Sequence, residues 1–176
     1  DSFVENNIQE IREKVGNDMI VSLRLSGSER NPKGFTPEDI AVFLSKAEEY
    51  VDLVEISTED VTYFMPSSYV PYCLNAEFAK RIKATGLVHI PIFLLGCVMT
   101  AEMAEEVISS GIADGVSMSR ALIADPCLPN KVRAGKEEDV IPCLRCLHCT
   151  SNDNARRFFE CSVNPTSGHE ARHGFS

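Results

Sequence analysis

The chain has 176 residues, 44% of them hydrophobic, which is enough for one domain built around an apolar core. Its formal net charge of −9 argues against general nucleic-acid binding, because a phosphate backbone requires a basic protein surface. No apolar run reaches the length of a membrane span. The cysteine pattern described below requires reduced thiols, and we find no export signal. We therefore expect a cytoplasmic protein.

Helical and strand-like periodicities alternate along the whole chain. A first helix is predicted by the apolar series Val4, Ile8, Ile11 and Val15. The predicted strands are residues 19–25, 52–56, 91–95 and 115–118. A helix follows each of them, the first capped by Thr36 and the third by Thr100. This alternation predicts right-handed βαβ units and a parallel sheet, either half of a (β/α)8 barrel or a small open sheet.

Four cysteines near the C-terminus follow the pattern C-x2-C-x2-C-x11-C: Cys143, Cys146, Cys149 and Cys161. The first three can surround one face of a compact inorganic cluster, and the fourth can close the other side. Soft thiolate ligands at this density favour an iron–sulfur centre, most simply a [4Fe-4S] cubane with one cysteine per iron. His148 lies inside the motif, but the cysteines already complete a four-ligand set, so we expect it beside the site.

Two other interpretations of the cysteines remain open. Structural zinc usually takes two separated CxxC pairs, whereas three of these cysteines share one loop. A disulfide framework is the second alternative, although the chain has seven cysteines and no export signal. The dispersed residues Cys73, Cys97 and Cys127 are expected to be ordinary, partly buried thiols.

Three segments resemble consecutive parts of the old yellow enzyme family: residues 21–26 (VSLRLS), 90–96 (IPIFLLG) and 113–126 (ADGVSMSRALIADP). The cysteine motif and residues 163–165 (VNP) are similar to the iron–sulfur flavoenzymes of the 2,4-dienoyl-CoA reductase, trimethylamine dehydrogenase and enoate reductase group. The resemblance implies strands five to eight of an FMN-binding TIM barrel over residues 1–135, and an iron–sulfur segment over residues 136–176. It also implies an N-terminal half-barrel and a C-terminal region for FAD and NAD(P)H outside this chain.

The resemblance further implies a set of FMN-binding residues. Arg24 lies near the end of a predicted strand, where a buried cation could stabilise negative charge on the reduced flavin; an ion pair with a neighbouring acid is the alternative. Gly96 and the pair Ser119-Arg120 follow the last two strands, where barrels commonly bind phosphate. Cys97 and Ser119 stand where the family often has glycine, so the loop geometry is expected to depart from the usual one at Cys97.

The loop of residues 57–74 is expected to line the substrate side of the flavin. In dienoyl-CoA reductases, a histidine near the start of this loop helps a tyrosine to deliver a proton. Here Glu59 lies near that position, so Glu59 or Tyr63 is predicted as the proton donor; a solvated acid and a packed aromatic ring are the alternative. As an alternative role, the aromatic residues Tyr63, Phe64, Tyr69 and Tyr72 are expected to shape an apolar pocket.

The predicted function is NAD(P)H-dependent reduction of an activated C=C bond in a small-molecule substrate, through FMN and a [4Fe-4S] cluster. By the resemblance, electrons would reach FMN from a second flavin through the cluster. An amine dehydrogenase of the trimethylamine dehydrogenase type is the nearest alternative, and a non-catalytic α/β module with structural zinc is another. Because half a barrel leaves two sheet edges unpaired, we expect self-association, weak FMN binding and no independent activity.

Overall fold

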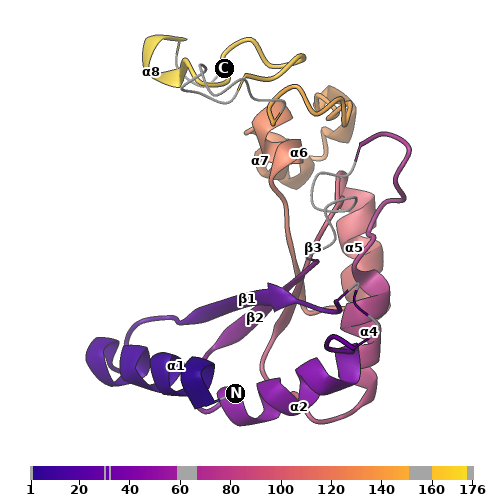
Figure 1. Cartoon of the computed structure of the whole chain (residues 1–176). Coiled ribbons are helices and arrows are strands. Elements are labelled where there is room, and N and C mark those ends of the chain that lie inside the picture. Colours follow the sequence, from indigo (N-terminus) through magenta and orange to yellow (C-terminus); the bar gives the residue numbers. More distant parts are fainter. Residues whose placement is uncertain (1, 30, 32, 59–66, 151–159, 174–176) are drawn as a thin grey trace.

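The computed structural model of the chain describes residues 2–29, 31, 33–58, 67–150 and 160–173. Its centre is a parallel sheet of four strands in sequence order: β1 (Ser22–Ser26), β2 (Leu53–Ser57), β3 (Ile92–Leu95) and β4 (Gly115–Ser117). The long helices lie together on one side of this sheet (Figure 1): α1 (Ser2–Val15), α2 (Pro37–Ala47), α4 (Ala76–Ala84) and α5 (Ala101–Ser109). This arrangement confirms the predicted α/β fold with half the strands of a closed barrel.

Shorter elements follow the last strand. They are α6 (Arg120–Ala124), α7 (Leu128–Arg133), a 3-10 turn η1 (Glu137–Asp139) and α8 (Glu170–His173). Figure 1 shows α6, α7 and the yellow C-terminal segment beyond the sheet, at the end away from α1 and α2. The cysteine motif lies between η1 and α8, and it is therefore carried at this same end of the molecule.

Local sequence explains where several elements begin. The side chain of Thr36 accepts a hydrogen bond from the backbone N–H of Asp39, whose carboxylate accepts one in return from the Thr36 backbone, and Pro37 occupies the first helical turn. The first strand begins at Ser22, three residues later than predicted. Its register explains the difference, because Ser22 pairs with Leu53, the first residue of β2.

The core lies between the sheet and its helices. Val54, Ile56 and Leu94 are completely buried, and they pack against α2 and α4 through Leu44 and Ile82. Burial of one such side chain contributes roughly 1.5–3 kcal/mol. Alternation along the strands directs the neighbouring positions to the opposite face of the sheet.

That opposite face carries Arg24, Glu55, Phe93 and Gly115 at one level, as the strand register shows. Gly115 is required there, because a Cβ atom would lie 2.6 Å from the ring of Phe93. In a closed barrel this face is the interior. Here it is the uncovered face of the described sheet.

Some predicted inner-face positions proved to be exposed. Ile8 of α1 packs with Ala47 and Val51, but Ile11 and Val15 are 47% and 39% exposed. Ile108 of α5, which follows the apolar positions Met103, Ala104 and Val107 and was therefore also expected on the inner face, is 42% exposed as well. The physical reason at α1 is the end of the sheet at β1, since no described element covers the rest of the apolar stripe of α1. None of the described helices is long and apolar enough to cross a membrane.

Candidate functional site

The carboxyl ends of the four strands surround a cavity of about 230 Å³. Parallel strands end at one edge of a sheet, and this edge holds the active sites of barrel enzymes. All five residues predicted to bind flavin line the cavity: Arg24, Gly96, Cys97, Ser119 and Arg120. The other lining residues are Ser57, Thr58, Asn75, Leu95, Val98, Met99, Ser117 and Thr150.

Arg24 differs from the predicted buried cation. Its side chain is exposed on the uncovered face of the sheet, and one guanidinium nitrogen donates to Ser57 Oγ at 3.3 Å. It forms no ion pair among the described residues, so its charge is not neutralised by the neighbouring Glu55. Glu55 instead accepts a hydrogen bond of 2.6 Å from Ser117 Oγ. Arg24 is thus a cation directed to the face where the prediction places the flavin.

Gly96, directly after β3, packs closely against Asn75. Its φ of +121° is a conformation that side chains disfavour, and a Cβ atom would lie 2.7 Å from Asn75 Nδ2. Asn75 is 1% exposed and donates from Nδ2 to the Leu95 carbonyl at 2.5 Å. Its Oδ1 is buried with no hydrogen-bond partner in the described part of the chain. An unsatisfied acceptor beside a cavity is a natural contact for a bound molecule that carries a donor.

Cys97 follows in the left-handed region, with φ of +56°. Glycine adopts this backbone conformation more readily than cysteine does. This agrees with the glycine that the old yellow enzyme family often has at this position. Cys97 is 5% exposed, more deeply buried than the partly buried thiol that was expected, and its Sγ lies 3.5 Å from a guanidinium nitrogen of Arg120. Arg120 begins α6, which spans only five residues. So short a helix has little dipole, and a phosphate contact here depends on backbone N–H groups and on the arginine itself.

The four cysteines of the motif line a second, small cavity beside the first. Arg120 lines both cavities, and therefore connects them. The cysteine loop turns through two left-handed residues, Arg145 with φ of +52° and Leu147 with φ of +63°. These turns direct three closely spaced cysteines toward one space, and the returning chain brings Cys161 to it.

The thiols share one electrostatic environment. Burial raises the pKa of the Cys149 thiol, and the nearby Cys143 and Cys161 raise it further, while Arg120 opposes the change. A hydrogen bond with Ser162 lowers the pKa of Cys146. In the described residues no three His, Cys, Asp or Glu side chains are set to hold a single metal ion. The four thiols line one small cavity, and thiolates are the ligands that iron–sulfur clusters take.

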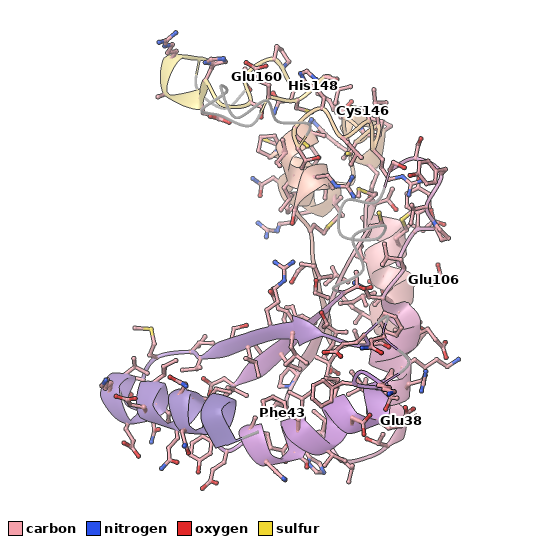
Figure 2. The ribbon with its side chains drawn as sticks, viewed as in Figure 1. Glu38, Phe43, Glu106, Cys146, His148 and Glu160 are labelled. Atoms are coloured by element: carbon pink, nitrogen blue, oxygen red, sulfur yellow. The ribbon has the colours of Figure 1, made fainter. Side chains whose placement is uncertain are left out.

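His148 stands apart from this thiol set. Its Nε2 lies 3.9 Å from a carboxylate oxygen of Glu160. Figure 2 shows Cys146, His148 and Glu160 close together at the end of the molecule opposite Phe43 and Glu38. The position agrees with the expectation that His148 lies beside the site.

Two anchors hold the ends of the cysteine segment against α6 and α7. Asp125, 3% exposed, pairs with Lys131 at 2.7 Å and accepts a hydrogen bond of 2.9 Å from the Ile141 backbone. Burial by itself raises the pKa of Asp125, but these hydrogen bonds outweigh burial and hold that pKa below its usual value. Asn164, just after the last cysteine, donates to the Ile123 carbonyl at 2.8 Å.

The predicted substrate loop is only partly described. Glu59, Tyr63 and Phe64 lie outside the described residues, so the role of Glu59 or Tyr63 as proton donor stays a prediction. Tyr69 and Tyr72 were expected to shape an apolar pocket, but they are 82% and 48% exposed. The described part of the loop, residues 67–74, instead contacts Arg145 of the cysteine segment through Ser68, Val70 and Tyr72.

Sequence reasoning missed two residues of this region, Asn75 and Arg145. Asn75 stands directly before α4, where an asparagine is usually interpreted as a helix cap. That interpretation gives no reason to expect the residue in the cavity wall, where the structure places it. Arg145 lies between the first two cysteines and could have been noticed as a lone cation inside a metal-ligand motif. Its contacts with distant segments could not be read from that position.

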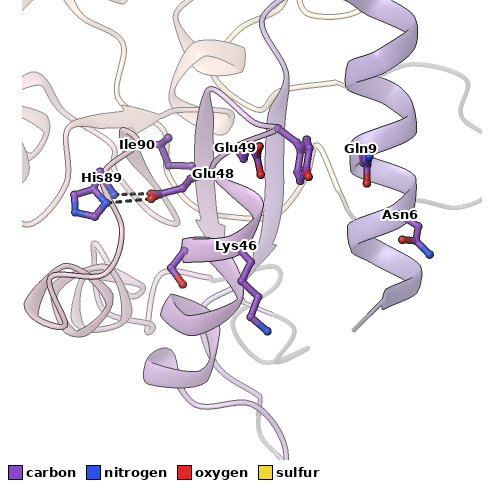
Figure 3. A pocket seen from close by; sticks show the side chains of 9 residues that line it. Asn6, Gln9, Lys46, Glu48, Glu49, His89 and Ile90 are labelled. Atoms are coloured by element: carbon purple, nitrogen blue, oxygen red, sulfur yellow. Dashed lines mark hydrogen bonds and ion pairs between the residues drawn. The ribbon is translucent and has the colours of Figure 1, made fainter.

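A larger, more open hollow of about 790 Å³ lies at the amino-terminal end of the strands. Figure 3 shows that residues of α1, the end of α2 and the segment before β3 line it, with Glu48 joined to His89. The two side chains are 3.1 Å apart, and Glu48 also accepts from the His89 backbone at 2.9 Å. This end of a barrel sheet contributes to stability rather than to chemistry, and none of the predicted site residues is there.

The chain is similar to several known oxidoreductases. The chain is 33% identical to an NADH oxidase of Thermoanaerobacter brockii over 171 residues, which are 93% of this chain and 26% of that protein. It is 29% identical to a dimethylamine dehydrogenase of Hyphomicrobium sp. (98% of this chain, 24% of that one) and 30% identical to a cinnamate reductase of Clostridium sporogenes (95% and 28%). The chain thus spans about a quarter of the length of these curated relatives.

The fold is also found among solved structures. Histamine dehydrogenase from Rhizobium sp. 4-9 matches 96% of this chain with a TM-score of 0.86 and 24% identity, over 24% of its own length. Residues 2–139 match the family described as NADH:flavin oxidoreductase / NADH oxidase. This match includes every strand of the sheet and all five residues predicted to bind flavin. The chain belongs to the NADH:flavin oxidoreductase / NADH oxidase family.

Proposed function

We propose that this chain is the part of a flavin-dependent oxidoreductase that binds the phosphate end of FMN and a [4Fe-4S] cluster. The observation that carries the proposal is the pair of adjoining cavities, one at the carboxyl ends of the strands and one lined by four cysteines, with Arg120 in the wall of both. Membership of the NADH:flavin oxidoreductase / NADH oxidase family supports FMN binding in the first cavity. The soft donor set supports the second.

The residues of the strand-end cavity fit FMN. Gly96 has no side chain and lets its backbone pack directly against Asn75 in the cavity wall, and the unpartnered Oδ1 of Asn75 can accept a hydrogen bond from a ligand. Arg24 would place its charge beside the flavin ring, while the backbone of Cys97 and Ser119 and the side chain of Arg120 would hold the phosphate. When bound, FMN would supply hydride transfer and the cluster single-electron transfer.

For the reaction, we propose NAD(P)H-dependent reduction of an activated C=C bond. The relative named cinnamate reductase supports this reaction class. Oxidation of an amine is the second candidate, supported by the relative named dimethylamine dehydrogenase at similar identity. For C=C reduction, Glu59 and Tyr63 remain the candidate proton donors.

The test begins with anaerobic purification and measurement of iron, acid-labile sulfide, zinc and FMN per chain. We expect about four irons and four sulfides. The variant Cys161→Ser should lose most of this iron, whereas Cys127→Ser, outside the motif, should keep it. One zinc without sulfide, in protein from iron-supplied cells, would instead establish the structural-zinc alternative.

Activity measurements then separate the two reaction classes. Because the chain alone is expected to have no independent activity, the assays use the whole protein that contains it. That protein is given cinnamate with NADH or NADPH, and separately dimethylamine with an artificial electron acceptor. Consumption of reduced nucleotide that depends on cinnamate supports C=C reduction. Acceptor reduction that depends on the amine, without any nucleotide-dependent reduction, overturns it in favour of amine oxidation.

A further inference from the structure

Arg145 is a buried cation in the middle of the cysteine motif. It is only 7% exposed and lies between Cys143 and Cys146, in the wall of the cysteine-lined cavity. Its own backbone N–H donates to Cys143 Sγ at 3.4 Å. Its backbone is left-handed, with φ of +52°.

The side chain contacts a segment about 75 positions earlier in the sequence. One terminal nitrogen donates to the Val70 carbonyl at 2.5 Å and the other to the Ser68 carbonyl at 2.7 Å. The guanidinium also stacks on the ring of Tyr72, 4.0 Å from its centre. Three contacts to five consecutive residues fix the position of this segment against the cysteine loop, because a planar fork cannot rotate without losing them.

The same nitrogen that binds Val70 lies 3.8 Å from Cys97 Sγ, in the wall of the strand-end cavity. Arg145 therefore contacts three parts of the site at once: the cysteine loop, the segment 68–72, and the loop after β3. The arrangement makes the geometry of each part depend on the others.

The charge of Arg145 connects these contacts to the cysteine-lined cavity. In the described residues Arg145 forms no ion pair with a carboxylate, and a buried charge without an opposite charge is costly. Two carbonyl oxygens and an aromatic ring offset part of that cost. Thiolates that hold an iron–sulfur cluster carry net negative charge. They would supply the missing counter-charge across the cysteine-lined cavity, whose wall includes Arg145.

We propose that Arg145 is a positioning residue that couples the state of the iron–sulfur loop to the segment 68–72, the described part of the predicted substrate loop. This inference depends on the proposed function, because the cluster supplies the counter-charge. With the cluster in place, Arg145 is held in its buried position and fixes segment 68–72. Loss of the cluster removes the counter-charge and releases the segment.

Hydrogen–deuterium exchange tests the coupling. Amide exchange over residues 67–74 is measured in the anaerobically purified protein, before and after the metal is removed with a chelator and an oxidant. We expect removal to speed exchange there about tenfold or more, the factor that corresponds to loss of one charge-assisted hydrogen bond. The variant Arg145→Met should exchange equally fast with its iron retained, whereas Arg133→Met, an exposed arginine of α7, should match the parent.

A second readout distinguishes charge from packing. The cluster midpoint potential should fall in Arg145→Met, since loss of a nearby cation disfavours the more negative reduced state, and Arg145→Lys should restore it. If Arg145→Met assembles no cluster, Tyr72→Leu, which lies outside the motif, replaces it in the exchange measurement. Unchanged exchange in iron-loaded variants overturns the inference, while absence of iron from the parent protein overturns the proposed function instead.

Discussion

Gly96→Ala is the substitution for which the structure makes the sharpest prediction. The new methyl group would meet Asn75 Nδ2 at 2.7 Å and Asn75 Cγ at 3.3 Å. Asn75 cannot move away easily, because it is 1% exposed and its amide donates to the Leu95 carbonyl. The φ of +121° adds backbone strain for any residue with a Cβ atom.

The two effects can be estimated separately. Backbone strain in a sparsely populated region costs about 1–3 kcal/mol. Overpacking a filled site costs about 1–3 kcal/mol as well. We therefore expect Gly96→Ala to reduce the free energy of unfolding by about 3–4 kcal/mol. Gly86→Ala is the matched control, since Gly86 also has a positive φ, of +67°, but nothing within 4 Å of a Cβ atom; its cost should be about 1 kcal/mol.

Urea unfolding of five proteins measures these values: the parent, Gly96→Ala, Gly86→Ala, Asn75→Ala and the double variant Gly96→Ala/Asn75→Ala. In the double variant the clash is absent, so Gly96→Ala should cost about 1–2 kcal/mol less in the Asn75→Ala background. FMN affinity, measured by flavin fluorescence, should also fall in Gly96→Ala and remain unchanged in Gly86→Ala. Equal stability of Gly96→Ala and Gly86→Ala would refute the steric argument.

Three further predictions follow from burial and charge. Leu94→Ala, at a fully buried position, should cost about 3 kcal/mol in urea unfolding, whereas Leu144→Ala, 55% exposed, should cost less than about 0.5 kcal/mol; similar values would contradict the assigned core. Asp125 has a lowered pKa when folded, so its contribution is present above the usual carboxyl pKa of about 4 and is lost as pH falls through the folded value. Asp125→Asn should therefore lose about 3 kcal/mol at pH 7 and show a shallower loss of stability in acid, and an unchanged acid profile would refute the assignment. Ile20→Lys, at a residue 72% exposed beside β1, should leave stability within about 0.5 kcal/mol and reduce self-association in sedimentation velocity; undiminished self-association would exclude this edge as the contact.

Much of the fold was predictable from local patterns. Thr36 followed by Pro37 marked a helix start, and the structure shows the capping hydrogen bonds there. The short apolar runs marked four strands, because a parallel sheet covered by helices requires apolar segments of that length. Exposure of Ile11 and Val15 was not predictable, because periodicity shows which face of a helix is apolar but not whether another element covers it.

The features of the candidate site also divide into those that the sequence predicted and those that only the tertiary structure showed. The sequence alone determined the donor chemistry, since the spacing of Cys143, Cys146, Cys149 and Cys161 fixes how many thiols one loop can present. Only the tertiary structure decided that Arg120 borders both cavities and that Arg145 holds a segment 75 positions away at Val70. The reason is physical: ligand spacing is a property of a short stretch of backbone, whereas a contact between distant residues exists only after the sheet has brought their loops to one edge.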